Sequence, residues 1–222
     1  MIPRARHATF RTPFASRSST NVWSIIQAAG WPIWPLIFAS IIALALIFER
    51  LWSLRTSVVA PPGMVDRVLA EFRDTGATPE LLAKTASQGP LGRILAAGLA
   101  NVKAPRPVMK EAIEEVGRVV THDLERFLTS LGTIAVAAPL LGLLGTVIGM
   151  IEIFGSQTAA GSNPIQLAHG ISIALYNTAM GIIVAVPALI FYRHFRGKVD
   201  ELVVEMEQQA IKLVDFAHGD RR

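Results

Sequence analysis

Three long apolar stretches, separated by charged segments, dominate the pattern of hydrophobic and polar positions along this chain. The first is centred on Ile33–Ile47, the second runs from about Ser130 to Phe154, and the third runs from Ile171 to Tyr192. Each is long enough to cross a membrane as a helix, and a helix satisfies its own backbone hydrogen bonds where water is absent. Tryptophans near both ends of the first stretch fit the two membrane boundaries. The pattern therefore predicts an all-α integral membrane protein with three transmembrane helices.

Two of the predicted spans continue into charged helices outside the membrane. Before the second span, apolar residues recur at steps of three and four and define one helix face; they are Met109, Ile113, Val116, Val120, Leu124, Phe127 and Leu131. After the third span, the same spacing is shown by Val199, Leu202, Met206, Ala210, Leu213 and Ala217. Pro107 suits a first helical turn, so we expect an antiparallel pair of long helices. Shorter helices with a break at the membrane surface are the alternative.

These predictions divide the chain into six segments. They are an N-terminal segment with an interfacial helix (1–30), the first transmembrane helix (31–52), a helical loop (53–106), a long helix with the second span (107–154), a connector (155–170), and a long helix with the third span and the tail (171–218).

Lysine and arginine are distributed unevenly between the segments that join the spans. Leu51–Thr129 contains ten, the tail Arg193–Arg222 contains six, and Gly155–Gly170 contains none. Because positively charged loops stay in the cytoplasm, we predict that the long segment and the tail are cytoplasmic and the connector lies outside. Three crossings then place the N-terminus outside. The first twenty residues, with four arginines and no acid, resist this orientation and also resemble a transit peptide.

Composition excludes several functions. The absence of cysteine excludes disulfides, thiol catalysis and cysteine-ligated metals. The net charge of +4 is spread along the predicted cytoplasmic segments, so topology explains it better than nucleic-acid binding does. Neither a phosphate-cradling glycine loop nor a hydrolase or metalloprotease motif occurs. We therefore expect no enzyme, no nucleic-acid partner and no cofactor.

In the second span, small residues surround a single hydroxyl group. Gly142, Gly145 and Gly149 flank Thr146, and this spacing lets the backbones of two helices approach closely. Pro139, nearer the cytoplasm, frees a carbonyl and allows a bend.

The third span has a matching set of residues. Tyr176–Thr178 forms a polar cluster beside Gly181, and Pro187 matches the depth of the second-span proline. Counted from the predicted outer ends, Thr146 and Thr178 lie at a similar depth. Two readings remain open: the threonines bond back to their own helices, or they line a polar path for an ion.

Glu152 is the one formal charge between Arg126 and Arg193. A carboxylate inside a bilayer is unfavourable, but this one lies close to the predicted outer end of its span. It is either a solvated interfacial group or an outer vestibule group that gathers cations or protons. His169, across the connector, is the candidate partner in the second case.

Two stretches carry a family resemblance: APLLGLLGTVIGMIEIF (Ala138–Phe154) and ISIALYNTAMGIIVAVPALIFY (Ile171–Tyr192). They closely resemble the second and third spans of the ExbB/TolQ/MotA proton-channel family, and the ExbB branch fits best. The resemblance extends over about Trp31 to Phe216. It implies a motor stator subunit of the bacterial inner membrane, in which a lipid-embedded homo-pentamer surrounds the single helices of two ExbD-like chains. Proton flow would then do work on a TonB-like protein for outer-membrane transport, or serve envelope integrity in a TolQ-like complex.

The resemblance also implies roles for individual residues. Thr146 and Thr178 would line the proton path and face an aspartate of the partner. The residues that would pack the helices and shape the wall are Pro139, Gly142, Gly145, Gly149, Gly181 and Pro187. One position departs from the family, because many members have a glutamate five residues before the third-span threonine, where this chain has Ile173. Either the partner's aspartate alone titrates, or Glu152 partly substitutes.

Two other classes of function compete with the motor subunit. A permease subunit would need a substrate site built from Asn177, Tyr176 and Glu152. A passive scaffold would assemble through the glycine face and the cytoplasmic helices without an ion path. The absence of further membrane carboxylates favours protons over sodium as the transported ion.

Overall fold

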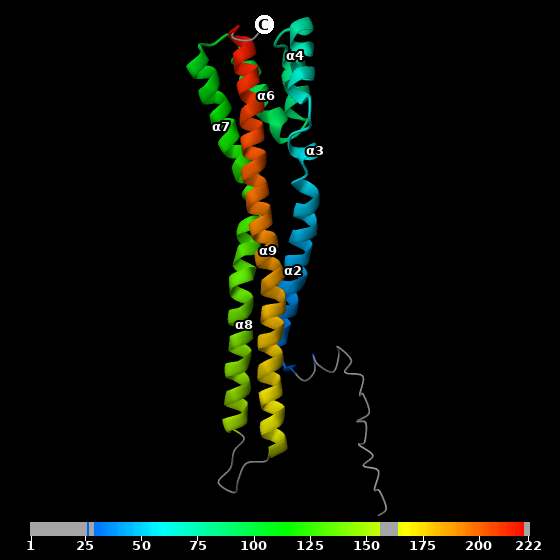
Figure 1. The fold of residues 1–222 in the computed structure, drawn as a ribbon, viewed down its shortest axis with the longest axis vertical. Coiled ribbons are helices and arrows are strands. Elements are labelled where there is room, and N and C mark those ends of the chain that lie inside the picture. The colour runs from blue at the N-terminus through cyan, green and yellow to red at the C-terminus, as the bar shows by residue number, and fades with distance from the viewer. Residues whose placement is uncertain (1–25, 27–28, 156–163, 220–222) are drawn as a thin grey trace, which may run out of the picture.

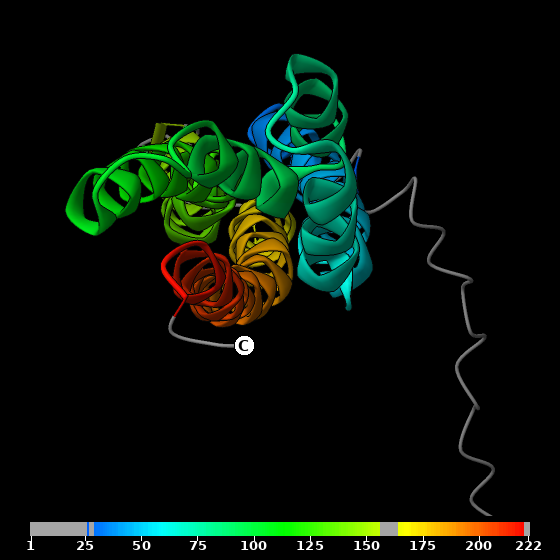
Figure 2. The ribbon, with the colours of Figure 1, turned by 90° about the horizontal axis from the view of Figure 1, so that it is seen from above.

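The computed structural model describes residues 26, 29–155 and 164–219, and every regular element within these residues is a helix. The helices are α2 (Ile33–Ser53), α3 (Thr56–Val59), α4 (Met64–Thr75), α5 (Pro79–Ala86), α6 (Pro90–Ala100), α7 (Arg106–Glu125), α8 (Leu128–Gly155) and α9 (Pro164–Ala217). Figure 1 shows α9 running the length of the molecule, with α8 and α2 beside one half and α7 and the shorter helices beside the other. Viewed from above, α9 lies between α7–α8 on one side and α2 and α4 on the other (Figure 2).

Three helical segments are long and apolar enough to cross a membrane, as the sequence predicts: Ile33–Ser53, Arg106–Gly155 and Leu167–Ala217. Many large apolar side chains on α2, α8 and α9 are exposed, among them Phe38, Leu140 and Ile183. Apolar side chains that face outward around a helical bundle are stable in lipid and unfavourable in water. The structure therefore describes a multi-pass membrane protein.

The expected long helix over 107–154 is interrupted in its hydrogen bonding at Arg126 and Phe127, between α7 and α8. Arg126 keeps helical backbone angles (φ −45°, ψ −45°), so the chain continues in the same direction. The guanidinium of Arg50, on α2, donates from Nη1 to the carbonyl oxygen of Leu124 at 3.1 Å. It also lies 4.8 Å from the centroid of the Phe127 ring. A buried cation from another helix thus stabilises the end of α7.

The third long helix begins at Pro164, seven residues before the predicted start at Ile171. Proline has no N–H to satisfy and its φ is already helical, so it suits a first helical position. The predicted connector, 155–170, is accordingly helical from residue 164, and residues 156–163 lie outside the described part of the chain. The first span begins at Ile33, two residues after its predicted start.

The predicted apolar faces of the two long helices are confirmed. Met109, Val120 and Leu124 of α7 are buried, as are five of the six predicted positions on α9, from Val199 to Leu213. They enclose α6, whose Leu91, Leu95 and Leu99 are almost fully buried. Ion pairs join the helices of this bundle at its surface. Arg106–Asp215 (2.9 Å) and Arg196–Glu125 (3.4 Å) link α7 to α9, and Arg93–Asp123 (2.8 Å) links α6 to α7.

Candidate functional site at the contact between α8 and α9

Four glycines form the contact between the membrane-spanning parts of α8 and α9. Gly142, Gly145 and Gly149 are buried on one face of α8, and Gly181 is buried on α9. A Cβ added at Gly142 would lie 2.8 Å from the carbonyl oxygen of Asn177, and one at Gly181 would lie 2.7 Å from that of Ala138. Neither distance is compatible with a side chain, so the two backbones are nearly in contact.

Asn177 occupies the space opposite Gly145. It is fully buried, and a Cβ added at Gly145 would lie 2.5 Å from the Cβ of Asn177. Its amide nitrogen Nδ2 donates to the carbonyl oxygens of Ala29 at 2.9 Å and Ile173 at 3.0 Å. The sequence suggests Asn177 only as part of a polar cluster and of a permease substrate site. It gives no local signal for the contact with Ala29, which is 148 residues away in the sequence.

Thr178 lies at the level of Gly142, where a Cβ on the glycine would be 3.2 Å from the threonine Cα. Its hydroxyl oxygen Oγ1 is buried and has no hydrogen-bond partner among the described residues. Membrane threonines commonly donate to the carbonyl one turn back, but no such bond is formed by Thr178. The hydroxyl group is therefore left without a hydrogen bond within the described part of the chain.

Thr146 has a different environment. Its side chain is half-buried, and Oγ1 donates to the carbonyl oxygen of Leu143 in its own helix at 2.6 Å. It borders a hollow of about 540 Å³ on the surface of α8, with Val147, Met150, Ile151, Phe154 and Gly155 as the other lining residues. Thr146 thus bonds back to its own helix, and its side chain also faces the hollow.

The two threonines do not meet within one chain. Thr178 is level with Gly142, and Thr146 follows Gly142 by four residues, which is about 6 Å along a helix. The expectation of similar depth counted Thr178 from Ile171, whereas the helix starts at Pro164. Thr178 therefore lies about one turn further from the connector than Thr146 does.

Both prolines lie inside their helices: Pro139 in α8 and Pro187 in α9. Pro139 directly follows Ala138, which is fully buried and whose carbonyl oxygen faces Gly181. Pro187 is exposed, between the buried Ala185 and Ala188. The prolines thus lie on the side of the glycine contact that is farther from the connector between α8 and α9.

Glu152 is exposed near the end of α8, and no described residue forms an ion pair with it. His169 is also exposed, on the first turns of α9. The structure therefore does not bring this histidine and glutamate together in an ion pair. The vestibule role of Glu152 stays a prediction.

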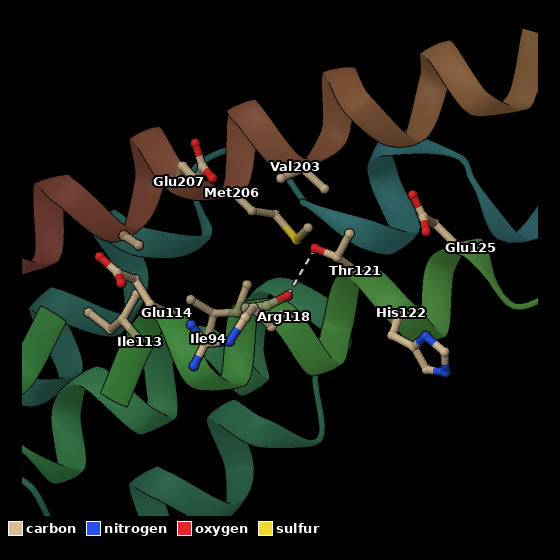
Figure 3. A pocket seen from close by; sticks show the side chains of 12 residues that line it. Ile94, Ile113, Glu114, Arg118, Thr121, His122, Glu125, Val203, Met206 and Glu207 are labelled. Carbon is tan, nitrogen blue, oxygen red and sulfur yellow. Dashed lines mark hydrogen bonds between the residues drawn. The ribbon is translucent and has the colours of Figure 1, made fainter. Parts of the chain in front are cut away.

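A second concave surface lies outside the apolar segments, between α6, α7 and α9, and has a volume of about 420 Å³. Figure 3 shows Val203 and Met206 of α9 facing Ile94 and Ile113, with Glu114, Arg118, Glu125 and Glu207 around them. Thr121 donates to the carbonyl oxygen of Gly117 at 2.9 Å. An apolar floor with a charged rim is typical of a surface that packs against another protein. Among the described residues, no group of three or more side chains could hold a metal ion.

Comparison with known proteins gives the class of this chain. A model described as the MotA/TolQ/ExbB proton channel family matches residues 86–208, which include the whole α8–α9 contact. The biopolymer transport protein exbB1 of Vibrio cholerae is 34% identical over 73% of this chain and 74% of its own length. Biopolymer transport protein ExbB-like 3 of Synechocystis is 34% identical over 77% of this chain and 83% of its own. The Tol-Pal system protein TolQ of Pseudomonas aeruginosa is 26% identical over 83% and 87%.

The three apolar helices describe a multi-pass membrane protein, and the family match makes it a channel protein rather than an enzyme. The chain belongs to the MotA/TolQ/ExbB proton channel family, as the two quoted stretches predict.

Proposed function

We propose that this chain is an inner-membrane subunit of a proton-driven motor complex of the ExbB–ExbD type. In this proposal, copies of the chain form a pentamer around the single helices of two ExbD-like chains. Proton flow then performs work on a TonB-like protein that drives active transport across the outer membrane. The observation that supports it most strongly is the buried, unpartnered hydroxyl of Thr178 at the α8–α9 contact of a proton-channel family member.

The chemistry of the contact supports transport of a proton that another chain carries. Glu152 is the only acid between Arg126 and Arg193, and it lies near the end of α8 rather than at the contact. A neutral hydroxyl can donate and accept hydrogen bonds but cannot store a proton near neutral pH. The titrating group is therefore assigned to the membrane carboxylate of the ExbD-like partner. The isoleucine at 173, where many family members have glutamate, agrees with this assignment.

The energy available is adequate for mechanical work. One elementary charge that crosses 100 mV releases about 2.3 kcal/mol, so a few protons per cycle can drive a conformational change in a partner. A five-fold ring around an asymmetric pair of helices has mismatched symmetry, and rotation of one part relative to the other is the motion we propose.

A TolQ-like role in envelope integrity is the second candidate. The observation in its favour is the length of the match to the Pseudomonas TolQ, which covers more of both chains than the quoted ExbB relatives do. The lower identity, 26% against 34%, favours the ExbB assignment.

Orientation is part of the proposal. We infer that residues 53–106, α7 and the end of α9 lie in the cytoplasm, because these segments are rich in lysine and arginine. The N-terminus and the connector then lie in the periplasm, and Glu152 lies near the periplasmic surface.

Proton flux in liposomes that contain the chain and its ExbD-like partner tests the role of the threonines. We expect Thr178→Val to reduce flux at least about tenfold, because valine has nearly the same shape but no hydroxyl for the path. A tenfold reduction corresponds to a barrier that is higher by about 1.4 kcal/mol. Thr146→Val should also reduce flux. Thr133→Val is the matched control, since Thr133 lies in α8 and bonds back to Thr129 at 2.9 Å but is far from the contact. Equal flux in all variants, with intact complexes, would contradict the proposed path.

A further inference from the structure

Asn177 is the only fully buried polar side chain among the described residues of the three apolar stretches, apart from Arg50 at the boundary. A buried amide without hydrogen bonds is unfavourable by about 1–3 kcal/mol on protein mutational scales. A buried asparagine in an apolar stretch is therefore tolerated only where neighbouring groups form hydrogen bonds with it.

Both protons of the amide are used. Nδ2 donates to the carbonyl oxygen of Ile173, one turn earlier in α9, and to that of Ala29, which precedes α2. Because both partners are acceptors, the nitrogen rather than the oxygen of the amide must face them. The bond to Ala29 joins residues 148 apart, and both residues are fully buried. A side chain of α9 thus holds the backbone that enters α2.

The residue that packs against this side chain is a glycine, which leaves space for it. Gly145 lies directly against it, and a Cβ at this glycine would be 2.7 Å from Cγ and 3.1 Å from Nδ2 of Asn177. Any larger residue at 145 would displace the amide from Ala29. Gly30, with φ +73°, turns the chain immediately after the tethered carbonyl and into α2.

The Asn177–Ala29 hydrogen bond, called the tether below, brings α9, the segment just before α2 and Gly145 of α8 together at one level. Beyond it, Leu36 of α2 packs against Ala138 of α8 and Val184 and Ala185 of α9. The bond from Asn177 holds the segment just before α2, and the apolar cluster holds α2 itself. Together these two contacts restrict the rotation of α9 about its own axis. Thr178 is the next residue on α9, so the direction of its hydroxyl depends on that rotation.

We propose that Asn177 is a positioning residue that tethers the lead-in of α2 to α9 and thereby sets the orientation of Thr178 at the α8–α9 contact. The Ala29–Asn177 hydrogen bond and the glycine opposite it are the observations that carry the proposal. The effect on proton flux rests on the proposed function, whereas the tether itself does not.

The tether is tested by the accessibility of Ala29 in the complex of this chain with its ExbD-like partner. The chain contains no cysteine, so Ala29→Cys introduces a single thiol. We expect it to be protected from a membrane-impermeant maleimide in the otherwise unchanged chain and labelled at least about tenfold faster with Asn177→Ala or Asn177→Leu. Asn177→Leu keeps bulk against Gly145 and so separates loss of the tether from loss of packing. Ser172→Ala is the control, because Ser172 bonds only to Ala168 of its own helix.

Flux in the same variants, without the cysteine, tests the positioning role. We expect Asn177→Leu to lower proton flux about tenfold through misplacement of Thr178, with partner capture unchanged and Ser172→Ala unaffected. Unchanged protection of Ala29→Cys in both Asn177 variants would overturn the tether. Unchanged flux in Asn177→Leu, while the unmodified complex conducts, would overturn the positioning role. Faster labelling together with no flux in the unmodified complex would retain the tether and contradict the proposed function instead.

Discussion

At the α8–α9 contact, the absence of side chains determines how closely the two helices approach. Gly145 and Gly181 face backbone or side-chain atoms at distances that leave no room for a methyl group. The polar residues Asn177 and Thr178 lie in the space that these glycines provide. Single residues thus set both the spacing of the helices and the chemistry of the buried level.

Gly145→Ala tests this steric requirement. The new methyl group would overlap Asn177, and we expect a loss of about 1–3 kcal/mol in the stability of the folded chain, the usual range for overpacking. Thermal unfolding in detergent should show a clearly lower Tm.

Gly197→Ala is the matched control, because Gly197 is a helical, exposed glycine of α9 with no neighbouring atom near the added methyl. It should gain about 0.5–1 kcal/mol from the better helix propensity of alanine. A similar Tm change in both variants would show that space at Gly145 is not limiting.

At the scale of elements, Arg50 links α2 to the junction of α7 and α8. Its guanidinium contacts the carbonyl of Leu124, pairs with Glu49 at 2.6 Å and stacks on Phe127. Because this junction lies between the apolar part of α8 and the charged α7, it is the point at which movement of one segment would reach the other.

We expect Arg50→Met to destabilise the chain by about 2 kcal/mol, since a charged hydrogen bond to a buried carbonyl is lost. Hydrogen exchange should become faster in residues 124–128. Arg55→Met is the control: Arg55 is exposed and stacks on Trp52, so its loss should change stability by no more than about 0.5 kcal/mol. Unchanged exchange at the junction in Arg50→Met would contradict the linking role.

The ion pair between α6 and α7 predicts a pH dependence. A hydrogen bond from Arg93 lowers the pKa of the Asp123 carboxyl. A lowered folded-state pKa contributes stability above the unfolded pKa, and this contribution disappears as pH falls through the folded pKa. We expect Arg93→Gln to have a slightly lower Tm at neutral pH and the difference from the unmodified chain to vanish in acid. A difference that grows in acid would contradict this assignment.

Local sequence patterns predicted which segments are helical, and which faces of them are buried, better than they predicted where the helices begin and which residues lie at the same level. The faces of α7 and α9 followed from apolar periodicity, because burial of a helix face depends on residues that are close in sequence. The start of α9 was placed late, since residues 164–170 lack the continuous apolar character of a span and the helix-starting role of Pro164 was not weighed. Because of this late start, the predicted depth of Thr178 was the same as that of Thr146, whereas Thr178 lies about one turn deeper.

Contacts between distant segments had no such signal. The hydrogen bond from Asn177 to Ala29 and the one from Arg50 to Leu124 each join segments that no local pattern relates. The glycines of α8 indicated close packing but not which residue of α9 would face each of them. The family motifs located the buried level, and only the three-dimensional structure distinguished the roles of its members.

At the scale of the whole molecule, the membrane-spanning part and the α4–α7 bundle are joined by α9, which contacts both (Figure 1). A continuous helix transmits displacement along its axis because its hydrogen bonds run in that direction. In the proposed motor, a displacement of α9 at Thr178 would therefore reach the concave surface between α6, α7 and α9, which Met206 lines, through a single helix.

The most direct test of the central claim is proton flux into liposomes that contain this chain alone, the ExbD-like partner alone, or both together. The account predicts flux driven by the membrane potential only when both chains are present, because this chain supplies neutral hydroxyls and the partner supplies the carboxylate. Substitution of the partner's membrane carboxylate by an amide should abolish that flux. Flux through this chain alone, or none through an assembled complex of both, would contradict the account.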